Sequence, residues 1–121
     1  MPRRHAEDLR RRQLISATLD TIAEVGFGAA TLTLIGQRAG VSAGLIAHYF
    51  GDKDGLLEAA LRSLASRLSR ATIEHLRAAP APRQRIQAVI EATLAPEEFE
   101  PRSCGVWLAF WGQVNHSARL R

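Results

Sequence analysis

Cysteine is nearly absent from this chain of 121 residues, in which Cys104 stands alone. One thiol cannot form a disulfide within the chain, so a fold held together by internal disulfides is excluded. A chain without disulfides is typical of the reducing cytoplasm, where we expect this protein to act. No histidine or other base lies near Cys104 in the sequence, so we expect an inert, partly buried thiol.

Long apolar runs and strand patterns are also missing. No stretch of the sequence approaches the roughly 20 apolar residues of a membrane-spanning helix, and residues 1–12 lack the apolar centre of a signal peptide. Residues 31–34 give the one short alternation typical of a strand, and their neighbours continue it as a helix. The sequence therefore predicts an all-α protein with no membrane partner.

Patterns that carry catalysis or bind metals are not found. The four histidines have no metal-ligand spacing, and no nucleophile and base can be paired from the sequence. The acidic cluster of Glu97, Glu98 and Glu100 is expected to be a solvated loop. We therefore expect no enzymatic activity, no metal and no cofactor.

The charge balance favours a polyanionic partner. Lys and Arg number 16 against 12 Asp and Glu, which gives a net charge of +4 and a pI of about 10.5. The excess is not concentrated in the first half, so a DNA-binding face must come from geometry. The basic residues near the start form either a solvated, disordered tail or an arm along DNA phosphates, and both interpretations stay open. These residues are Arg3, Arg4, Arg10, Arg11 and Arg12.

Helical periodicity and helix breakers predict six helices. They cover approximately residues 7–25, 32–39, 43–50, 52–78, 83–94 and 103–121. In the fifth helix, Ile86, Val89, Ile90 and Leu94 are expected to face the core. The sixth is expected to be buried on several sides, because its segment 106–111 is apolar almost all round.

Residues 31–50 carry the strongest functional pattern. Two short predicted helices, capped by Thr31 and Ser42, are separated only by the tripeptide 40–42, which begins with a glycine. Such a tight link makes the helices cross steeply, as in a helix-turn-helix, whose second helix lies in the major groove of DNA. The sequence predicts a DNA-binding domain at residues 1–51 and a linker helix with an incomplete regulatory domain at 52–121.

The second helix of this motif has an apolar face and a face of small and polar residues. Ile46 and Phe50 are expected to pack inward against Ile35. The opposite face exposes small residues, which let the backbone approach the groove, and His48 and Tyr49, which can bind a phosphate or a base edge. The alternative is a half-exposed aromatic pair on a three-helix core.

The tripeptide 40–42, Gly44, the tripeptide 48–50 and Lys53 together resemble the signature of the tetracycline-repressor family, and the resemblance extends over residues 10–60. It implies a homodimer that reads a pseudo-palindromic operator in double-stranded DNA, with one three-helix head on each half-site. The residues expected to contact DNA are Thr31, Thr33, Ser42, Ala43, Gly44, Leu45, His48, Tyr49 and Lys53.

Within the family, residues 11–15, 54–59 and 107–111 resemble the repressors of glycine-betaine synthesis genes that respond to choline. Trp107 and Trp111 lie one helical turn apart, at a spacing that suits a cation–π box for a quaternary ammonium ion. Ordinary core packing is the alternative for both indoles, and Phe110 is expected to face elsewhere, into the core.

Members of this family are longer than 121 residues, so the chain is expected to be truncated at its C-terminal end. A second hypothesis follows from that expectation. The chain would then be an interaction module that forms mixed dimers with a full-length relative and has no repressor activity of its own.

Overall fold

The computed structural model describes residues 2–116 and 118 of the chain. This part of the chain is all-α, as predicted, with six α-helices, one short 3₁₀ turn and no strand. The elements are α1 (Pro2–Ala29), α2 (Leu32–Ala39), α3 (Ala43–Phe50), α4 (Lys53–Arg77), α5 (Pro82–Thr93), the 3₁₀ turn (Pro96–Phe99) and α6 (Pro101–Gln113).

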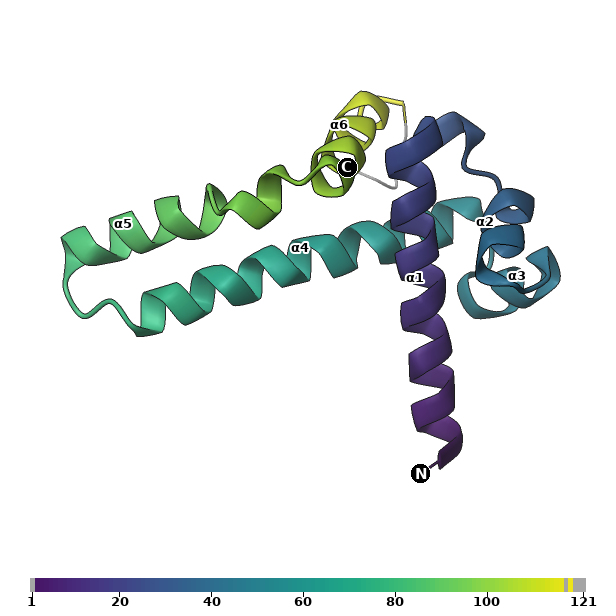
Figure 1. Cartoon of the computed structure of the whole chain (residues 1–121), viewed down its shortest axis with the longest axis horizontal. Helices are drawn as coiled ribbons and strands as arrows, with labels where there is room; N and C mark the ends of the chain where they lie inside the picture. The colour runs from purple at the N-terminus through teal and green to yellow at the C-terminus, as the bar shows by residue number, and fades with distance from the viewer. Residues whose placement is uncertain (1, 117, 119–121) are drawn as a thin grey trace.

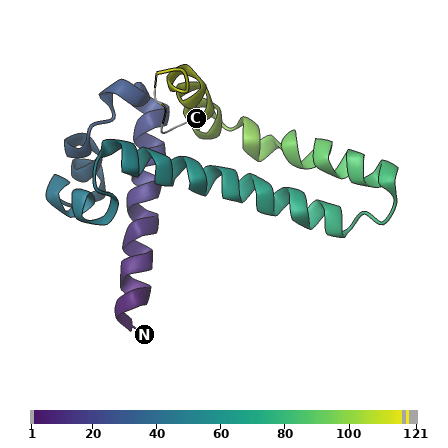
Figure 2. The same cartoon turned by 180° about the vertical axis from the view of Figure 1, so that it is seen from behind.

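The helices form a compact head with a long arm (Figure 1). Helices α4 and α5 lie side by side in opposite directions and make the arm. Helix α1 crosses the base of α4 steeply, α2 and α3 pack on one side of this crossing, and α6 lies against the C-terminal half of α1. The view from behind shows the N-terminal half of α1 projecting away from the other helices (Figure 2).

One apolar core joins the head to the end of the chain. Helix α1 contributes Leu14 and Ile22, and their neighbours in the core come from every helix except α5. The threonine hydroxyls that are buried beside them, on Thr18 and Thr21, each donate to the carbonyl four residues earlier at 2.7 Å. The remaining large members of the cluster are Leu19, Ile35, Ile46, Leu56, Leu57, Leu64 and Val106.

Local signals place most helix ends where the sequence predicts them. The side chains of Thr31, Ser42 and Asp52 each accept a hydrogen bond from the backbone N–H three residues later, at 3.1, 3.1 and 2.7 Å. These caps fix the starts of α2, α3 and α4. Gly40 ends α2 with φ 71° and ψ 31°, a left-handed conformation that glycine adopts without steric cost.

Two helices, α1 and α6, differ from the prediction at their ends. Helix α1 begins at Pro2 rather than near residue 7, so the basic N-terminal segment is helical and exposed. Gly26 interrupts α1 with φ 80° and ψ 175°, and one further helical turn follows it. Helix α6 begins at Pro101 and ends at Gln113 instead of continuing to the end of the chain. Residues 117 and 119–121, which the predicted helix included, lie outside the described residues.

The predicted burial of α5 is wrong. Its small residues Ala88 and Ala92 are buried, whereas the large apolar residues expected in the core are exposed, from 41% for Val89 to 65% for Ile86. Alanine permits a close approach between α4 and α5, and within the described chain nothing covers the opposite face of α5. Ile90 and Leu94 share that exposed face.

The predictions for α6 and for the preceding loop also need correction. Only Ser103 and Val106 of α6 are buried, while Leu108 and Trp111 are 73% and 62% exposed. The helix packs on α1 along one face and is not surrounded. The acidic segment before it is largely exposed, as predicted, but forms a 3₁₀ turn rather than a loop. Cys104 is partly buried, as expected, with its Sγ 3.7 Å from the carbonyl oxygen of Glu98.

Candidate nucleic-acid interface

Helices α2 and α3 are joined by the tight turn that the sequence predicts. The backbone N–H of Val41 donates to the carbonyl of Gly36 at 2.9 Å, which closes α2, and the Val41 side chain is half-buried against the core. Ser42 then starts α3. Because a single residue separates the left-handed Gly40 from the Ser42 cap, the direction of α3 is fixed relative to α2.

Helix α3 presents one face to the core and one to solvent. Ile46 is fully buried beside Ile35, and Phe50 packs partly against the same core, as predicted. The opposite face carries Gly44 and His48, which are exposed, and the half-exposed Ala43, Leu45, Ala47 and Tyr49. A helix with this division can lie in a major groove without losing its packing on the head.

His48 and Tyr49 are partners as well as surface groups. Their ring centroids lie 5.6 Å apart with nearly perpendicular planes, and the centroid of the Tyr49 ring lies 6.4 Å from that of Phe50. Tyr49 is also packed partly against the core. The aromatic-pair alternative therefore describes real contacts, and the same contacts hold the two polar groups on the exposed side of α3.

Arg11 holds the C-terminal end of α3 from outside the motif. Its guanidinium donates to the carbonyl oxygen of Tyr49 at 3.2 Å and lies over the Phe50 ring, 4.8 Å from the centroid. From the sequence, Arg11 belongs with the N-terminal arginines, and its contact with α3 is not predicted. Its position one turn before the buried Leu14 was the available signal.

Lys53, predicted to bind a phosphate, contacts the last turn of α1. Its Nζ donates to the carbonyl oxygen of Gly28 at 3.2 Å and lies 5.8 Å from the centroid of the Phe27 ring. An ammonium group has three donors, so this bond leaves others for a phosphate. The contact holds the charge beside the start of α4.

Helix α2 is fastened to α1 by an ion pair. Arg38 donates to a carboxylate oxygen of Glu24, and this bond, together with the charge of Arg38, holds the pKa of the Glu24 carboxyl below its ordinary value. The pKa of Arg38 is raised in turn.

Thr31 and Thr33, predicted to contact DNA, lie exposed on the solvent side of α2, where Thr31 serves as the N-cap.

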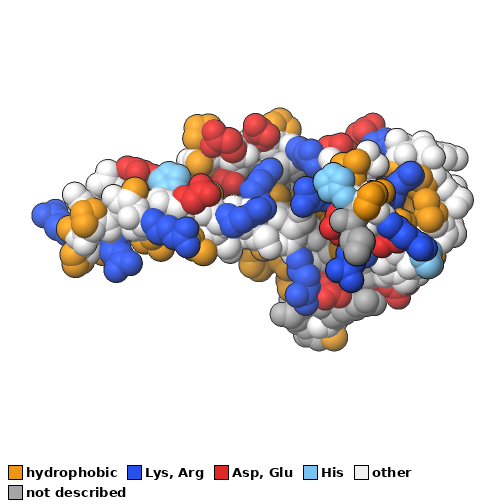
Figure 3. Space-filling model, turned by 90° about the horizontal axis from the view of Figure 1, so that it is seen from below, with side chains coloured by type: hydrophobic (Ala, Val, Ile, Leu, Met, Phe, Trp, Pro, Cys, Tyr) orange, Lys and Arg blue, Asp and Glu red, His pale blue; other side chains and the backbone are white. Residues whose placement is uncertain are grey.

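Positive charge is spread along the molecule rather than confined to the head. In the view from below, Lys and Arg side chains lie along the arm and over the head, with acidic groups between them (Figure 3). This distribution agrees with the expectation that gross charge does not define the DNA face. The shape of α3 and its few polar groups must provide specificity.

The two tryptophans of α6 form an aromatic chain with Phe110. The Trp107 and Phe110 centroids lie 6.1 Å apart, and those of Phe110 and Trp111 lie 5.4 Å apart. The Phe110 ring therefore contacts both indoles, contrary to the expectation that it faces elsewhere. Trp107 packs partly against the core, whereas Trp111 is exposed.

Comparison with known proteins agrees with this geometry. Residues 14–60 match the family described as "Bacterial regulatory proteins, tetR family", and residues 82–121 match "BetI-type transcriptional repressor, C-terminal". The chain belongs to the tetR family. These families are defined as regulatory proteins, in line with the expectation that the chain is not an enzyme.

Curated relatives share the sequence over the whole chain. The HTH-type transcriptional regulator BetI of Paraburkholderia phytofirmans is 45% identical over 100% of the chain, and that of Klebsiella pneumoniae is 44% identical over 99%. The chain spans 63% of the length of each of these relatives.

Solved structures share the fold. A protein from Pseudomonas aeruginosa PAO1 aligns with a TM-score of 0.86 and 35% identity over 94% of this chain and 55% of its own. A transcriptional regulator from Rhodococcus sp. Rha1 aligns with a TM-score of 0.78 and 31% identity, over 91% of this chain and 58% of its own. Within the described residues, no helix is long and apolar enough to cross a membrane.

Proposed function

We propose that this protein is a BetI-type transcriptional repressor that reads double-stranded DNA with α3. The observation that carries the proposal is the division of α3 into a buried face, centred on Ile46, and an exposed face with Gly44 and His48. Fixed by the turn at Gly40, this helix has the shape that enters a major groove. The names of the BetI relatives support the same role.

One head offers one recognition helix, which covers one half-site. We therefore propose that two copies bind a pseudo-palindromic operator as a homodimer, in the cytoplasm, where the bacterial chromosome lies. The predicted contacts on α2, α3 and the start of α4 would then be used twice in each complex.

The test is fluorescence anisotropy with a labelled duplex from upstream of the gene, competed with unrelated DNA at fixed salt concentration. We expect the upstream duplex to bind at least about a thousandfold more tightly than the competitor. Weak binding that is equal for both duplexes would contradict the proposed repressor role.

Two variants locate the contact. Tyr49→Phe removes a hydroxyl while it keeps the ring packing, and Lys53→Ala removes the ammonium group at the start of α4. Each should weaken operator binding by about tenfold. Arg77→Ala, at the far end of α4, removes the same charge as Lys53→Ala and should leave specific binding unchanged. Unchanged affinity in both test variants would exclude this face as the DNA contact.

We further propose that choline or a related quaternary ammonium ion is the inducer and that it binds the aromatic chain of α6. Cations bind to the faces of indole rings, and Trp107 and Trp111 each contact the Phe110 ring in the described structure. The match of residues 82–121 to the BetI-type C-terminal family supports this choice of ligand.

Tryptophan fluorescence tests the inducer proposal. Choline should shift the emission in a saturable way, whereas sodium at the same ionic strength should not. Trp107→Ala should abolish the saturable response, and Leu108→Ala, on the same helix but exposed, should retain it. Saturable choline binding that survives in Trp107→Ala would rule out the aromatic chain as the site.

A second candidate function rests on the exposed apolar faces of α5 and α6. Ile86 and Ile90 of α5 and Trp111 of α6 are each more than half exposed, and exposed large apolar side chains often mark a surface that binds another protein. Such a surface suits a module that forms mixed dimers with a full-length relative. Light scattering would then detect a complex of both chains, and anisotropy would show that this complex binds no operator. Homodimers of this chain that bind the operator would contradict the second function.

A further inference from the structure

A hollow with several arginines lies where α1, α4 and α6 meet, away from α3. Its volume is about 200 Å³, and Arg12, Arg67, Arg70 and Arg102 contribute to its wall. We call it the arginine hollow. No acidic residue lines it in the described part of the chain.

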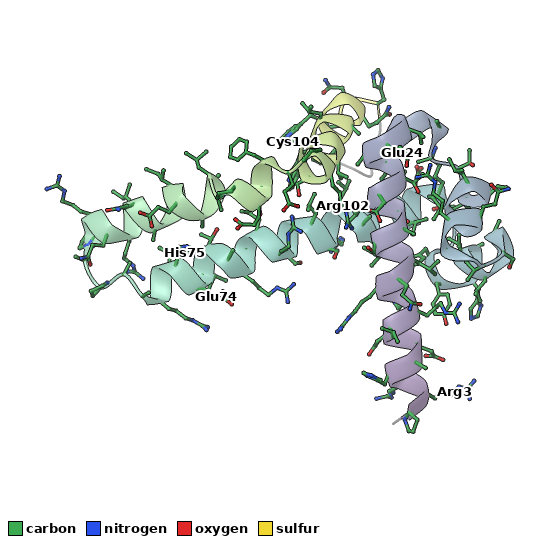
Figure 4. The ribbon with its side chains drawn as sticks, viewed as in Figure 1. Arg3, Glu24, Glu74, His75, Arg102 and Cys104 are labelled. Atoms are coloured by element: carbon green, nitrogen blue, oxygen red, sulfur yellow. The ribbon has the colours of Figure 1, made fainter. Side chains whose placement is uncertain are left out.

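Two of these arginines are held in place by the protein. Arg102 lies between α6 and α1 (Figure 4), with its Nε 3.0 Å from a carboxylate oxygen of Asp20 and a terminal nitrogen 3.2 Å from the Ser16 hydroxyl. Arg67 donates to the Ser103 hydroxyl at 3.0 Å. Their guanidinium groups are therefore oriented before any ligand arrives, which lowers the entropy lost on binding.

The other two arginines have no partner within the described structure. Arg12 comes from α1 and Arg70 from α4, and both are exposed. Four guanidinium groups around one hollow repel one another, and Asp20 compensates for only one of them. An anion that entered the hollow would relieve this repulsion.

The floor of the hollow strengthens its field. Leu19 and Leu64 are 7% and 4% exposed, and Ile15 lies beside them. Apolar walls lower the local dielectric constant, so the charges above them act over a greater distance than on an open surface. Ser16 and Ser63 add hydroxyl donors to the wall.

We propose that the arginine hollow binds a small oxyanion of at least two negative charges that carries phosphate groups. Guanidinium groups bind phosphate oxygens in pairs, and the hollow is large enough for such a group but too small for a nucleic acid helix. The ligand would connect three helices and so hold the head against the C-terminal part of the chain.

Isothermal titration calorimetry and thermal unfolding test the site with inorganic pyrophosphate, without DNA and at fixed ionic strength. Pyrophosphate should bind saturably and raise the Tm. Arg12→Gln and Arg70→Gln should each raise its Kd by about tenfold, because each removes a charged hydrogen bond. Arg77→Gln, which removes the same charge from α4 outside the hollow, should bind as the unmodified chain does.

Three outcomes would overturn the proposal. They are no saturable binding, an equal loss in Arg77→Gln, or binding that Arg12→Gln and Arg70→Gln leave unchanged. A parallel titration with a short DNA duplex tests whether the hollow binds the phosphates of the DNA backbone instead. If a short duplex depends on Arg12 and Arg70 while pyrophosphate does not bind, the hollow contacts the DNA backbone and the small-ligand proposal is wrong. Because the pyrophosphate arm contains no DNA, its failure leaves the proposed repressor role standing.

Discussion

The guanidinium group of Arg11 lies over the Phe50 ring at the end of α3, 4.8 Å from its centroid. The same group donates a hydrogen bond to the Tyr49 carbonyl oxygen. One side chain of α1 therefore binds a carbonyl group in the last turn of α3 and covers the last aromatic ring of that helix. A positive charge is favoured at this end of a helix. The orientation of the recognition helix therefore depends on a residue 38 positions earlier in the chain.

Arg11→Ala is expected to lower the free energy of unfolding by about 1 kcal/mol, because a cation–π contact and a hydrogen bond are lost at a partly exposed site. Operator affinity should fall by a factor that does not depend on salt concentration. The variant changes the position of α3 and removes no contact with a DNA phosphate. Arg10→Ala, on the same exposed helix, is the control. Anisotropy at several salt concentrations distinguishes the two, and a loss in Arg11→Ala that disappears at high salt would show that Arg11 acts on phosphate instead.

Substitutions at Ser42 separate stability from DNA binding. Ser42→Ala removes the cap of α3 and should cost about 1 kcal/mol of unfolding free energy. Ser42→Asp keeps a capping oxygen and adds a negative charge, so its stability should be close to that of the natural chain while operator binding is lost by repulsion from phosphate. Urea unfolding and anisotropy measure the two effects. Normal operator binding by Ser42→Asp would place the start of α3 away from the DNA backbone.

The ion pair between Glu24 and Arg38 makes stability depend on pH in the acidic range. The hydrogen bond from Arg38 and then its charge lower the pKa of the Glu24 carboxyl in the folded protein. The contribution is therefore complete above the ordinary carboxyl pKa of about 4 and is lost as the pH falls through the lower folded value. Arg38→Gln should return the pKa of Glu24 to its ordinary range. An NMR titration of the Glu24 carboxyl carbon gives the answer, and identical curves in both proteins would mean that the pair does not form in solution.

Two glycines of α6 should respond in opposite ways to alanine. A Cβ on Gly105 would lie 3.2 Å from the Cα of Ala23 and 3.3 Å from its carbonyl oxygen, so α1 and α6 would have to separate. A Cβ on Gly112 would meet no atom within 4 Å. Gly112→Ala should be neutral or stabilising by up to about 1 kcal/mol, through helix propensity alone. Gly105→Ala should be destabilising, and unfolding curves for the two variants decide. Equal stabilisation by both would show that the contact between α1 and α6 is loose.

The starts of α2, α3 and α4 could be predicted because their causes are local. Thr31, Ser42 and Asp52 cap helices whose first turns lie within three residues of the cap, and the sequence shows each cap directly. Gly40 likewise needs only its own backbone freedom to end α2. The motif, its turn and the buried Ile46 were therefore predicted correctly, while the DNA and choline contacts stay predictions.

Burial in α5 could not be predicted, because periodicity does not say which face meets a neighbour. Ile86 and Ile90 lie four residues apart, and so do Ala88 and Ala92, so both pairs fit one side of a helix. Only the pairing with α4 selects the alanines. The contacts of Arg11 and Lys53 were missed for a related reason, since long side chains reach segments far away in the sequence.

Val106 of α6 lies in the same core as Leu14 of α1 and Leu57 of α4. The predicted division of the chain at residues 51 and 52 stays a prediction about roles, and this shared core limits what can be cut or exchanged. A hybrid regulator that combined this head with the body of a relative would have to bring α6 with it, together with the close approach of Gly105 to Ala23. The unit that can be inherited or engineered as a whole is therefore larger than the unit that reads DNA.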